Sequence, residues 1–395
     1  MQNKQMNHSL FLGKGRFGRS FNISYEDLLA KHLLITGQTG SGKSTSAKQI
    51  VSELQEKDVT NIIFDPTGEY GLDLNNLVSY RLSQNAFIDL SNRSAEELLM
   101  LFDLHWDSTV TSKLQEAMTS LRIQAKRRIK GQILSKVNLA VKELEKSKAD
   151  LTALNQDYEM TLLPKQMIEE FARPFADESA DYSLCGQEID HDTVQKYWSD
   201  IQQLNQLLQD EVLNSIFHFT PVEKQGTQYE LSFILQTFEN RRNMKRSLVV
   251  NLSPLQAYPG IQQRVLSYLM DRVLMNRVDS KVNLPVAIFL DEAHRYLPVT
   301  EAINENGLFH LLREGRKHNL NVVVSTQSLK DLPAELRGQF GANLIHRYQS
   351  YEELIGLGLS PKKMKKLPNL AVGEALLLTT SKKSQILSIQ KPRTM

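Results

Sequence analysis

The sequence GQTGSGKS, from Gly37 to Ser44, lies between an apolar run at 32–36 (HLLIT) and a segment at 44–57 with helical spacing of its apolar residues. Its glycines permit backbone angles that turn successive N–H groups inward around a phosphate. The helix that follows adds the positive end of its dipole. This pattern predicts a P-loop, in which Lys43 reaches the β- and γ-phosphates of ATP and the Ser44 hydroxyl ligates Mg²⁺. A chance glycine-rich turn is the weaker interpretation, because a strand precedes these residues and a helix follows them.

Apolar runs of strand length recur along the chain and alternate with amphipathic segments. The runs lie at 61–65, 247–252, 285–290 and 321–326, and helical spacing is present at 261–278 and 307–318. Continuous apolar strands that alternate with helices are typical of a parallel sheet covered on both faces. The sequence therefore predicts an α/β fold, a P-loop NTPase core of the RecA-like type with a mainly parallel sheet. Short strands at 10–12 and 17–23 and a closing hairpin at 374–379 and 385–389 are expected in addition.

The middle of the chain has a different pattern. Residues 94–158 are rich in Lys, Glu, Gln, Leu and Ala, with no proline and one glycine, Gly131. This composition predicts long helices, and residues 188–216 have a helical pattern as well, whereas 162–186 is less regular. We therefore expect an N-terminal part of the ATPase core at 1–93, a helical insertion at 94–245, and a C-terminal part of the core at 246–395.

The composition limits the setting and the partners. The chain has 395 residues and a net charge of +2, so any contact with nucleic acid must come from local clusters of charge. Its one cysteine, Cys185, allows no disulfide within the chain, which fits a reducing compartment. The N-terminal residues lack the apolar core of a signal peptide, and no apolar run is long enough to cross a membrane. We expect a cytoplasmic protein without a membrane partner.

An acidic pair, Asp291 and Glu292, ends the apolar run at 285–290. Open α/β sheets bind their ligands at the carboxyl ends of their strands. Asp291 would hold Mg²⁺ through water or through Ser44, and Glu292 would polarise the attacking water. A solvated strand end is the alternative interpretation.

Two further strand ends carry candidate polar residues. Asp65 and Glu69, in DPTGEY after the run at 61–65, are expected at the same edge of the sheet as the P-loop. They either act near the nucleotide and its Mg²⁺-bound water or serve only the backbone of a turn. Gln327 follows the run at 321–326 and is a candidate to contact the γ-phosphate or to orient water, with a simple turn residue as the alternative.

Basic residues supply candidates for transition-state charge. Arg313 and Arg316 lie in LREGRKH, and phosphoryl transfer needs a cation that a neighbouring subunit often supplies. A solvated helix end is the competing interpretation. Arg347 is a weaker candidate of the same kind. The stretch KRRIK at 126–130 is expected to be a charged helix face rather than a nucleic-acid contact.

Taken together, the motifs resemble the HerA branch of the HerA–FtsK translocase superfamily. The resemblance rests on GQTGSGKS, DPTGEY at 65–70, LDEAH at 290–294, REGRK at 313–317, STQ at 325–327, IHR at 345–347 and residues 376–393. It covers about residues 10–90 and 245–393, in the family's order. The segment 94–245 matches the family's helical insertion in position but not in motif.

The resemblance implies a homo-hexameric ring that uses ATP to pull double-stranded DNA through its pore. It assigns the phosphate lysine to Lys43, the catalytic acid to Glu292, and the arginine that acts on a neighbour's nucleotide to Arg316 or Arg313. The nucleotide contacts expected from the P-loop and from DPTGEY are Gly37, Gln38, Thr39, Gly40, Ser41, Gly42, Lys43, Ser44, Thr45, Asp65 and Glu69.

The resemblance leaves the partner and the biological role open. HerA proteins usually begin with a β-barrel that docks a nuclease, and the roughly 35 residues before the P-loop here are too few for that barrel. We therefore expect another partner, since HerA-like proteins in antiviral operons lie beside nucleases or NAD-degrading enzymes. One hypothesis is a DNA translocase or helicase in DNA end processing or antiviral defence. The other is an ATP-binding oligomeric scaffold that assembles and regulates such an effector; the near-neutral charge favours it, whereas the resemblance favours the motor.

Overall fold

The computed structural model describes residues 9–70, 74–151, 157–220, 227–293, 297, 306–354, 357 and 359–392. Contacts divide the chain into two compact units, Met1–Arg81 with Ser232–Met395, and Leu82–Leu231. The second unit is one continuous stretch between the two parts of the first. It begins before residue 94 and ends before residue 245, the bounds expected from composition, because the short strands near its two ends, at 86–87 and 229–230, pair with each other.

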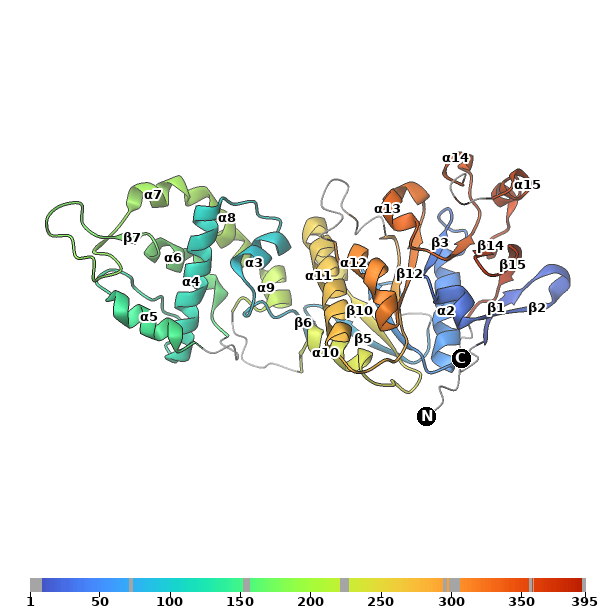
Figure 1. Cartoon of the computed structure of the whole chain (residues 1–395), viewed down its shortest axis with the longest axis horizontal. Helices are drawn as coiled ribbons and strands as arrows, with labels where there is room; N and C mark the ends of the chain where they lie inside the picture. Colours follow the sequence, from blue (N-terminus) through green and yellow to red (C-terminus); the bar gives the residue numbers. More distant parts are fainter. Residues whose placement is uncertain are drawn as a thin grey trace. The chain divides into compact units, whose positions relative to one another are not determined.

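The first unit is built around an eleven-stranded sheet with the order β2-β1-β15-β14-β13-β3-β12-β11-β4-β10-β5 (Figure 1). Neighbours from β13 to β5 are parallel. Neighbours from β13 to β2 are antiparallel. The predicted α/β fold with a mainly parallel sheet is confirmed, and so is the hairpin predicted from residues 374–389.

The strands of this sheet have the following bounds. The parallel part contains β3 (Leu33–Thr36), β4 (Thr60–Asp65), β5 (Leu77–Arg81), β10 (Ser247–Asn251), β11 (Val286–Leu290), β12 (Leu320–Thr326) and β13 (Ala342–Ile345). The antiparallel part contains β1 (Ser9–Lys14), β2 (Ser20–Ser24), β14 (Glu374–Thr379) and β15 (Gln385–Ile389). The helices beside them are α1 (Tyr25–Leu29), α2 (Lys43–Glu56), α10 (Leu231–Glu239), α11 (Pro259–Val278), α12 (Gly307–Glu314), α13 (Ala334–Arg337), α14 (Tyr351–Leu354) and α15 (Pro361–Met364).

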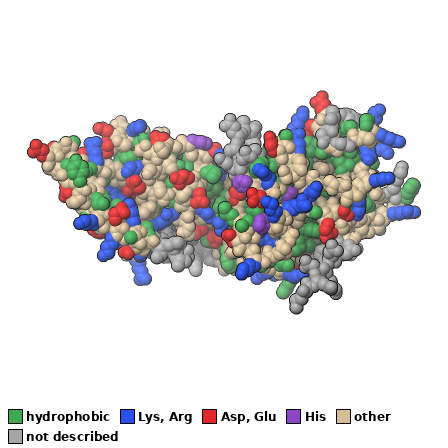
Figure 2. Space-filling model, viewed as in Figure 1, with side chains coloured by type: hydrophobic (Ala, Val, Ile, Leu, Met, Phe, Trp, Pro, Cys, Tyr) green, Lys and Arg blue, Asp and Glu red, His purple; other side chains and the backbone are tan. Residues whose placement is uncertain are grey.

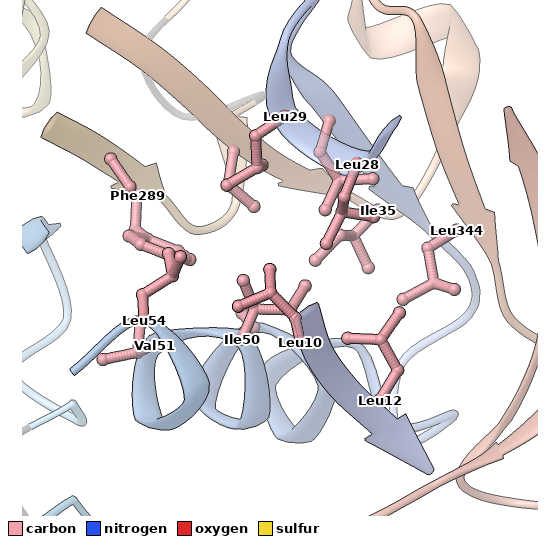
Figure 3. Close-up of a cluster of buried hydrophobic side chains, with 14 of the residues drawn as sticks. Leu10, Leu12, Leu28, Leu29, Ile35, Ile50, Val51, Leu54, Phe289 and Leu344 are labelled. Atoms are coloured by element: carbon pink, nitrogen blue, oxygen red, sulfur yellow. The ribbon is translucent and has the colours of Figure 1, made fainter. Parts of the chain in front are cut away.

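Burial explains why the central strands are continuous apolar runs. Every residue of β3, β4, β11 and β12 is buried. Because successive side chains of a strand point to opposite faces, both faces of the sheet must be covered. On one face, Ile35 of β3 and Phe289 of β11 belong to the same cluster as Ile50 of α2, and Leu10 and Leu12 of β1 extend it (Figure 3). The cluster therefore joins the two ends of the chain to the strand that precedes the P-loop.

The second unit consists of shorter helices than the sequence pattern predicts. They are α3 (Ala95–Leu101), α4 (Ser108–Lys126), α5 (Val141–Ala149), α6 (Leu163–Glu169), α7 (His191–Lys196), α8 (Trp198–Leu208) and α9 (Glu211–Phe217). Its strands are β6 (Ala86–Phe87), β7 (Ala172–Arg173), β8 (Glu188–Ile189) and β9 (Tyr229–Glu230). The chain leaves the helical conformation after Lys126, where Arg128 (φ 60°) and Gly131 (φ 68°) are left-handed. The stretch 126–130 is thus the end of a helix and a turn, not a helix face.

Among the described residues, no helix combines the length and the apolar composition that a membrane-spanning segment needs.

Candidate nucleotide-binding site

The P-loop connects the carboxyl end of β3 to α2. In the sheet, β3 lies beside β12, which is followed by β11 and β4. Because these strands are parallel, the residues after them meet along one edge of the sheet. That edge carries residues 37–44, Asp65, Asp291 and Gln327, so the topology brings most of the predicted site together.

Left-handed glycines shape the loop. Gly40 has a φ of 72°, and Gly42, directly before α2, has a φ of 109°. Side chains are strained at these angles, which explains the glycines. A Cβ added at Gly40 would meet nothing within 4 Å, so the loop has open space on that side. Such a loop at a helix N-terminus fits the phosphates of a nucleotide.

Lys43 is held inside the loop. Its ammonium donates to the backbone oxygens of Gly37 at 2.9 Å and Gln38 at 3.4 Å. Burial lowers the pKa of Lys43, and the carboxylates of Glu292 and Asp291 act in the opposite direction. The cation therefore lies near the acidic pair, where the β- and γ-phosphates of a P-loop nucleotide need positive charge.

The loop packs against His346, which follows β13, and Gly373, which precedes β14. A Cβ at Gly37 would lie only 2.6 Å from the Cβ of His346, and a Cβ at Gly42 only 3.1 Å from the Cα of Gly373. The Gly373 N–H donates to the backbone oxygen of Ser41 at 3.0 Å. His346 is fully buried, and burial lowers its pKa to about 4, so its imidazole is neutral at pH 7. This neutral ring adds no charge beneath the phosphate site.

Ser44 and Asp291 form a pair of oxygen ligands. The Ser44 hydroxyl donates to one carboxylate oxygen of Asp291 at 3.2 Å, and the Ser325 hydroxyl donates to the other. A hydroxyl and a carboxylate at one point match the hard oxygen ligands that Mg²⁺ takes, with water and phosphate completing its shell. The residues present therefore fit Mg²⁺ at the place predicted for it.

Glu292 occupies a constrained position after β11. Its φ of 56° is unusual for a residue with a side chain, a form of strain that is frequent at functional sites. The side-chain amide nitrogen of Gln327 donates to the Glu292 carboxylate at 3.2 Å. The Thr39 hydroxyl donates to the side-chain oxygen of Gln327 at 3.1 Å. The ends of β11 and β12 are thereby connected to the P-loop by side-chain hydrogen bonds.

Asp65 makes the contacts of a turn residue. One of its carboxylate oxygens accepts from the N–H groups of Gly68 at 2.8 Å and Thr67 at 3.2 Å, and the other accepts from Tyr70 at 3.0 Å. Glu69 is exposed in the same turn. The structure gives Asp65 a structural task, and a contact of Asp65 or Glu69 with nucleotide stays a prediction.

The two arginines are not at the P-loop. Arg313, near the end of α12, lies 5.1 Å from the Phe309 ring, and Arg316 lies in a 3₁₀ turn, Gly315–His318. Both are exposed, and Figure 2 shows Lys, Arg and His side chains gathered over α12 and the strand that follows it. They precede the amino end of β12, whose seven residues span roughly 20 Å. The arginines are therefore at the edge of the sheet opposite the P-loop.

His32 makes hydrogen bonds on both sides of the segment that carries these arginines. Its Nδ1 accepts the Val322 N–H at 3.0 Å, so the proton is on Nε2, which donates to the Leu312 oxygen at 2.9 Å. Burial, with a smaller contribution from the charge of Arg316, lowers the pKa of His32 to about 4. The neutral ring of His32, the residue before β3, is thus bonded to Leu312, which precedes the two arginines, and to Val322, which follows them.

Sequence reasoning gave no role to several residues that the structure places here. The sequence shows Ser325 only as part of STQ and His346 only as part of IHR, because nothing in the local pattern indicates which side chains meet across strands. Arg347 was a weak candidate; its backbone oxygen accepts the Gln38 N–H at 3.0 Å. Tyr70 is buried near Asp291, whose charge helps burial to raise the Tyr70 pKa. His294 of the LDEAH motif lies outside the described residues.

Comparison with known proteins places these observations in a family. The family model "Helicase HerA, central domain" matches residues 18–273. The DNA double-strand break repair helicase HerA of Sulfolobus acidocaldarius is 24% identical over 365 residues, which cover 89% of this chain and 62% of the relative. HerA of Saccharolobus solfataricus is 23% identical, covering 88% and 62%. The chain thus spans about three fifths of the length of these relatives.

Solved structures show the same fold. VirB4 of Thermoanaerobacter pseudethanolicus superposes with a TM-score of 0.62 at 14% identity and covers 96% of both chains. The plasmid coupling protein TrwB in complex with ADP and Mg²⁺ gives a TM-score of 0.55 at 13% identity, covering 95% of this chain and 88% of that one. At these identities the likeness extends to the fold alone.

Proposed function

We propose that this chain, which belongs to the family of the HerA helicase central domain, is an Mg²⁺-dependent ATPase that works as a homo-oligomeric ring on double-stranded DNA. One observation carries the ATPase assignment: the hydrogen bonds that connect the P-loop to the carboxyl ends of β11 and β12. Through them, Ser44 meets Asp291, and Thr39 reaches Glu292 by way of Gln327.

Each residue in this arrangement has a distinct task. The N–H groups of the P-loop and the Lys43 ammonium bind the phosphates of ATP. Ser44 and Asp291 hold Mg²⁺, whose chemistry is to neutralise charge on the β- and γ-phosphate oxygens. The Glu292 carboxylate accepts a proton from the attacking water, and Gln327 fixes the direction of that carboxylate. The support for these roles is the geometry of the side chains and their motif positions.

The negative charge that develops on the γ-phosphate needs an arginine to stabilise it. The position of Arg313 and Arg316 indicates that they act on the nucleotide of a neighbouring subunit. A cation at the opposite edge of the sheet is far from its own P-loop. In a head-to-tail ring, that edge would face the next subunit's nucleotide. We propose a hexamer assembled in this way.

A mixing experiment tests the ring. Glu292→Gln and Arg316→Ala are each expected to be inactive, and Arg313→Ala is tested in parallel. In an equal random mixture of the first two, about one interface in four joins an intact Glu292 to an intact arginine, so ATP turnover partly returns. A chain that stays monomeric with ATP, or exchanging subunits that regain no activity with either arginine variant, would refute hydrolysis across the interface.

The DNA part of the proposal is tested by ATP turnover with and without a DNA duplex. A motor on DNA is expected to turn over ATP faster when the duplex is present. Turnover that ignores DNA but changes when a partner effector is added would instead support an ATP-gated scaffold. The support for an effector, a nuclease or an NAD-degrading enzyme in DNA end processing or antiviral defence, is the family resemblance.

A further inference from the structure

Although the whole chain has a net charge of only +2, one side of the first unit concentrates basic residues. Three segments meet there: the β1–β2 hairpin, the β14–β15 turn, and α15 with the two residues that follow it. Their described cations, which we call the basic edge, are Lys14, Arg19, Lys362, Lys363, Lys365, Lys366, Lys382 and Lys383.

Contacts between the three segments show that the basic edge is one surface. Gly15 packs so closely on Gln385 that an added Cβ would lie 2.4 Å from its side-chain nitrogen. Lys363 donates to the hydroxyl of Ser384. The hairpin, the start of β15 and α15 are therefore neighbours, and Figure 2 shows Lys and Arg side chains over α15 and at the outer end of the hairpin.

Acidic residues do little to neutralise this surface. Residues 9–25 contain no acid, and residues 361–392 contain only Glu374. Asp27 pairs with Lys382 at 2.9 Å. Most of the cations, including Lys362, Lys365 and Lys366, are exposed. The surface therefore keeps a strong local positive charge that the composition of the whole chain conceals.

An aromatic residue stands at the tip of the hairpin. Phe17 is 90% exposed and has a φ of 62°, a strained angle for a bulky residue. The hydrogen bond from the Gly15 N–H to the Arg19 oxygen, at 2.8 Å, closes the turn beneath it. Aromatic rings held among cations stack on bases or wedge between base steps, while the cations neutralise phosphates.

We infer that the basic edge, with Phe17 at its tip, binds DNA through the phosphate backbone. The inference rests on the proposed function, since it names a surface through which the chain would hold its DNA. An anionic lipid surface and an acidic face of a second copy are the competing partners. A single exposed ring among many cations favours nucleic acid, because it supplies a stacking contact but little area for insertion into a bilayer.

The test measures binding of the full chain to a fluorescein-labelled DNA duplex by anisotropy, from roughly 50 to 200 mM salt. Replacing Lys362, Lys365 and Lys366 together by alanine should lower affinity at least about tenfold and reduce the slope of log K against log salt by about 3. Lys363 is kept because it bonds to Ser384. The matched control replaces three exposed lysines of the second unit, Lys130, Lys142 and Lys146, and should leave affinity and slope near those of the wild type.

Phe17 is tested separately. Phe17→Ala should weaken binding roughly tenfold with an unchanged salt slope, because stacking is not an ionic contact, and Phe17→Trp should keep the affinity. The inference is overturned if the wild type binds the duplex and the triple lysine variant binds it with the same slope. It is also overturned if that variant binds DNA normally but loses assembly or binding to phosphatidylserine vesicles. A wild type that hydrolyses ATP but binds no duplex refutes the DNA part of the proposed function itself.

Discussion

Replacing His32 by asparagine removes a buried base whose protonation the folded chain opposes. The His32 pKa falls from 6.5 to about 4 on folding, a difference of about 2.5 units. At 1.36 kcal/mol per unit, this corresponds to a maximum of about 3.4 kcal/mol. Asparagine tolerates the φ of 65° at this position and retains a donor and an acceptor, but it does not titrate.

The sign follows from linkage. The unfolded chain binds the proton below pH 6.5 and the folded chain only near pH 4, so the stability due to neutral His32 is present above pH 6.5 and is lost as the pH falls. By about pH 5, the free energy of unfolding has fallen by about 2 kcal/mol. For a unit the size of the first one, this loss lowers Tm by roughly 4–8 °C.

Calorimetry at about pH 7.5 and about pH 5 measures this difference. Wild type should lose several degrees more than His32→Asn between the two conditions, whatever the absolute stability of the variant. His191→Asn, at an exposed histidine of the second unit, is the control and should lose as much as wild type. Equal losses for wild type and His32→Asn would refute the buried neutral state of His32.

Three further changes test the site. Lys43→Ala should lower ATP turnover by at least about 100-fold and remove most nucleotide affinity, measured with a fluorescent ATP analogue, and wild-type turnover would end the ATPase interpretation. Glu292→Gln should bind ATP normally but hydrolyse it roughly 100- to 10,000-fold more slowly; loss of binding instead would make Glu292 structural and move the catalytic role to Glu69. Gly37→Ala should lower both Tm and ATP affinity because its Cβ meets His346, whereas Gly338→Ala, with open space around it, should be neutral in both assays.

Much of the fold was predictable because local pattern and burial agree. The runs HLLIT, NIIFD, PVAIFL and NVVVST are predicted as buried strands, and each contains all or most of a fully buried strand of the parallel sheet. The resemblance to HerA is confirmed by the family model. By contrast, β5 was missed, because its sequence LVSYR is half-polar and its pairing with β10 is visible only in three dimensions.

The limits of prediction are physical as well. The expectation of long helices in 94–158 rests on helix propensity alone. The chain nevertheless turns at Arg128 and Gly131, and the next helix begins only at Val141. The motifs identified Lys43, Asp291 and Glu292 as candidates, but not the hydrogen bonds through Gln327. The helical spacing at 307–318 likewise includes both Arg313 and Arg316, whereas Arg316 lies in a 3₁₀ turn after α12 ends.

The packing of the P-loop on the residue after β13 and the residue before β14 has a consequence for synthesis. The loop ends at residue 44 of 395, but Gly373 and His346, against which it packs, are made late, and β1 pairs with β15. At roughly 5–20 residues per second, a ribosome needs roughly half a minute to extend the chain from one to the other. Throughout that interval the nascent polypeptide has no finished phosphate pocket. Incomplete chains that end before β14 would therefore neither sequester ATP nor enter an assembly as nucleotide-bound subunits.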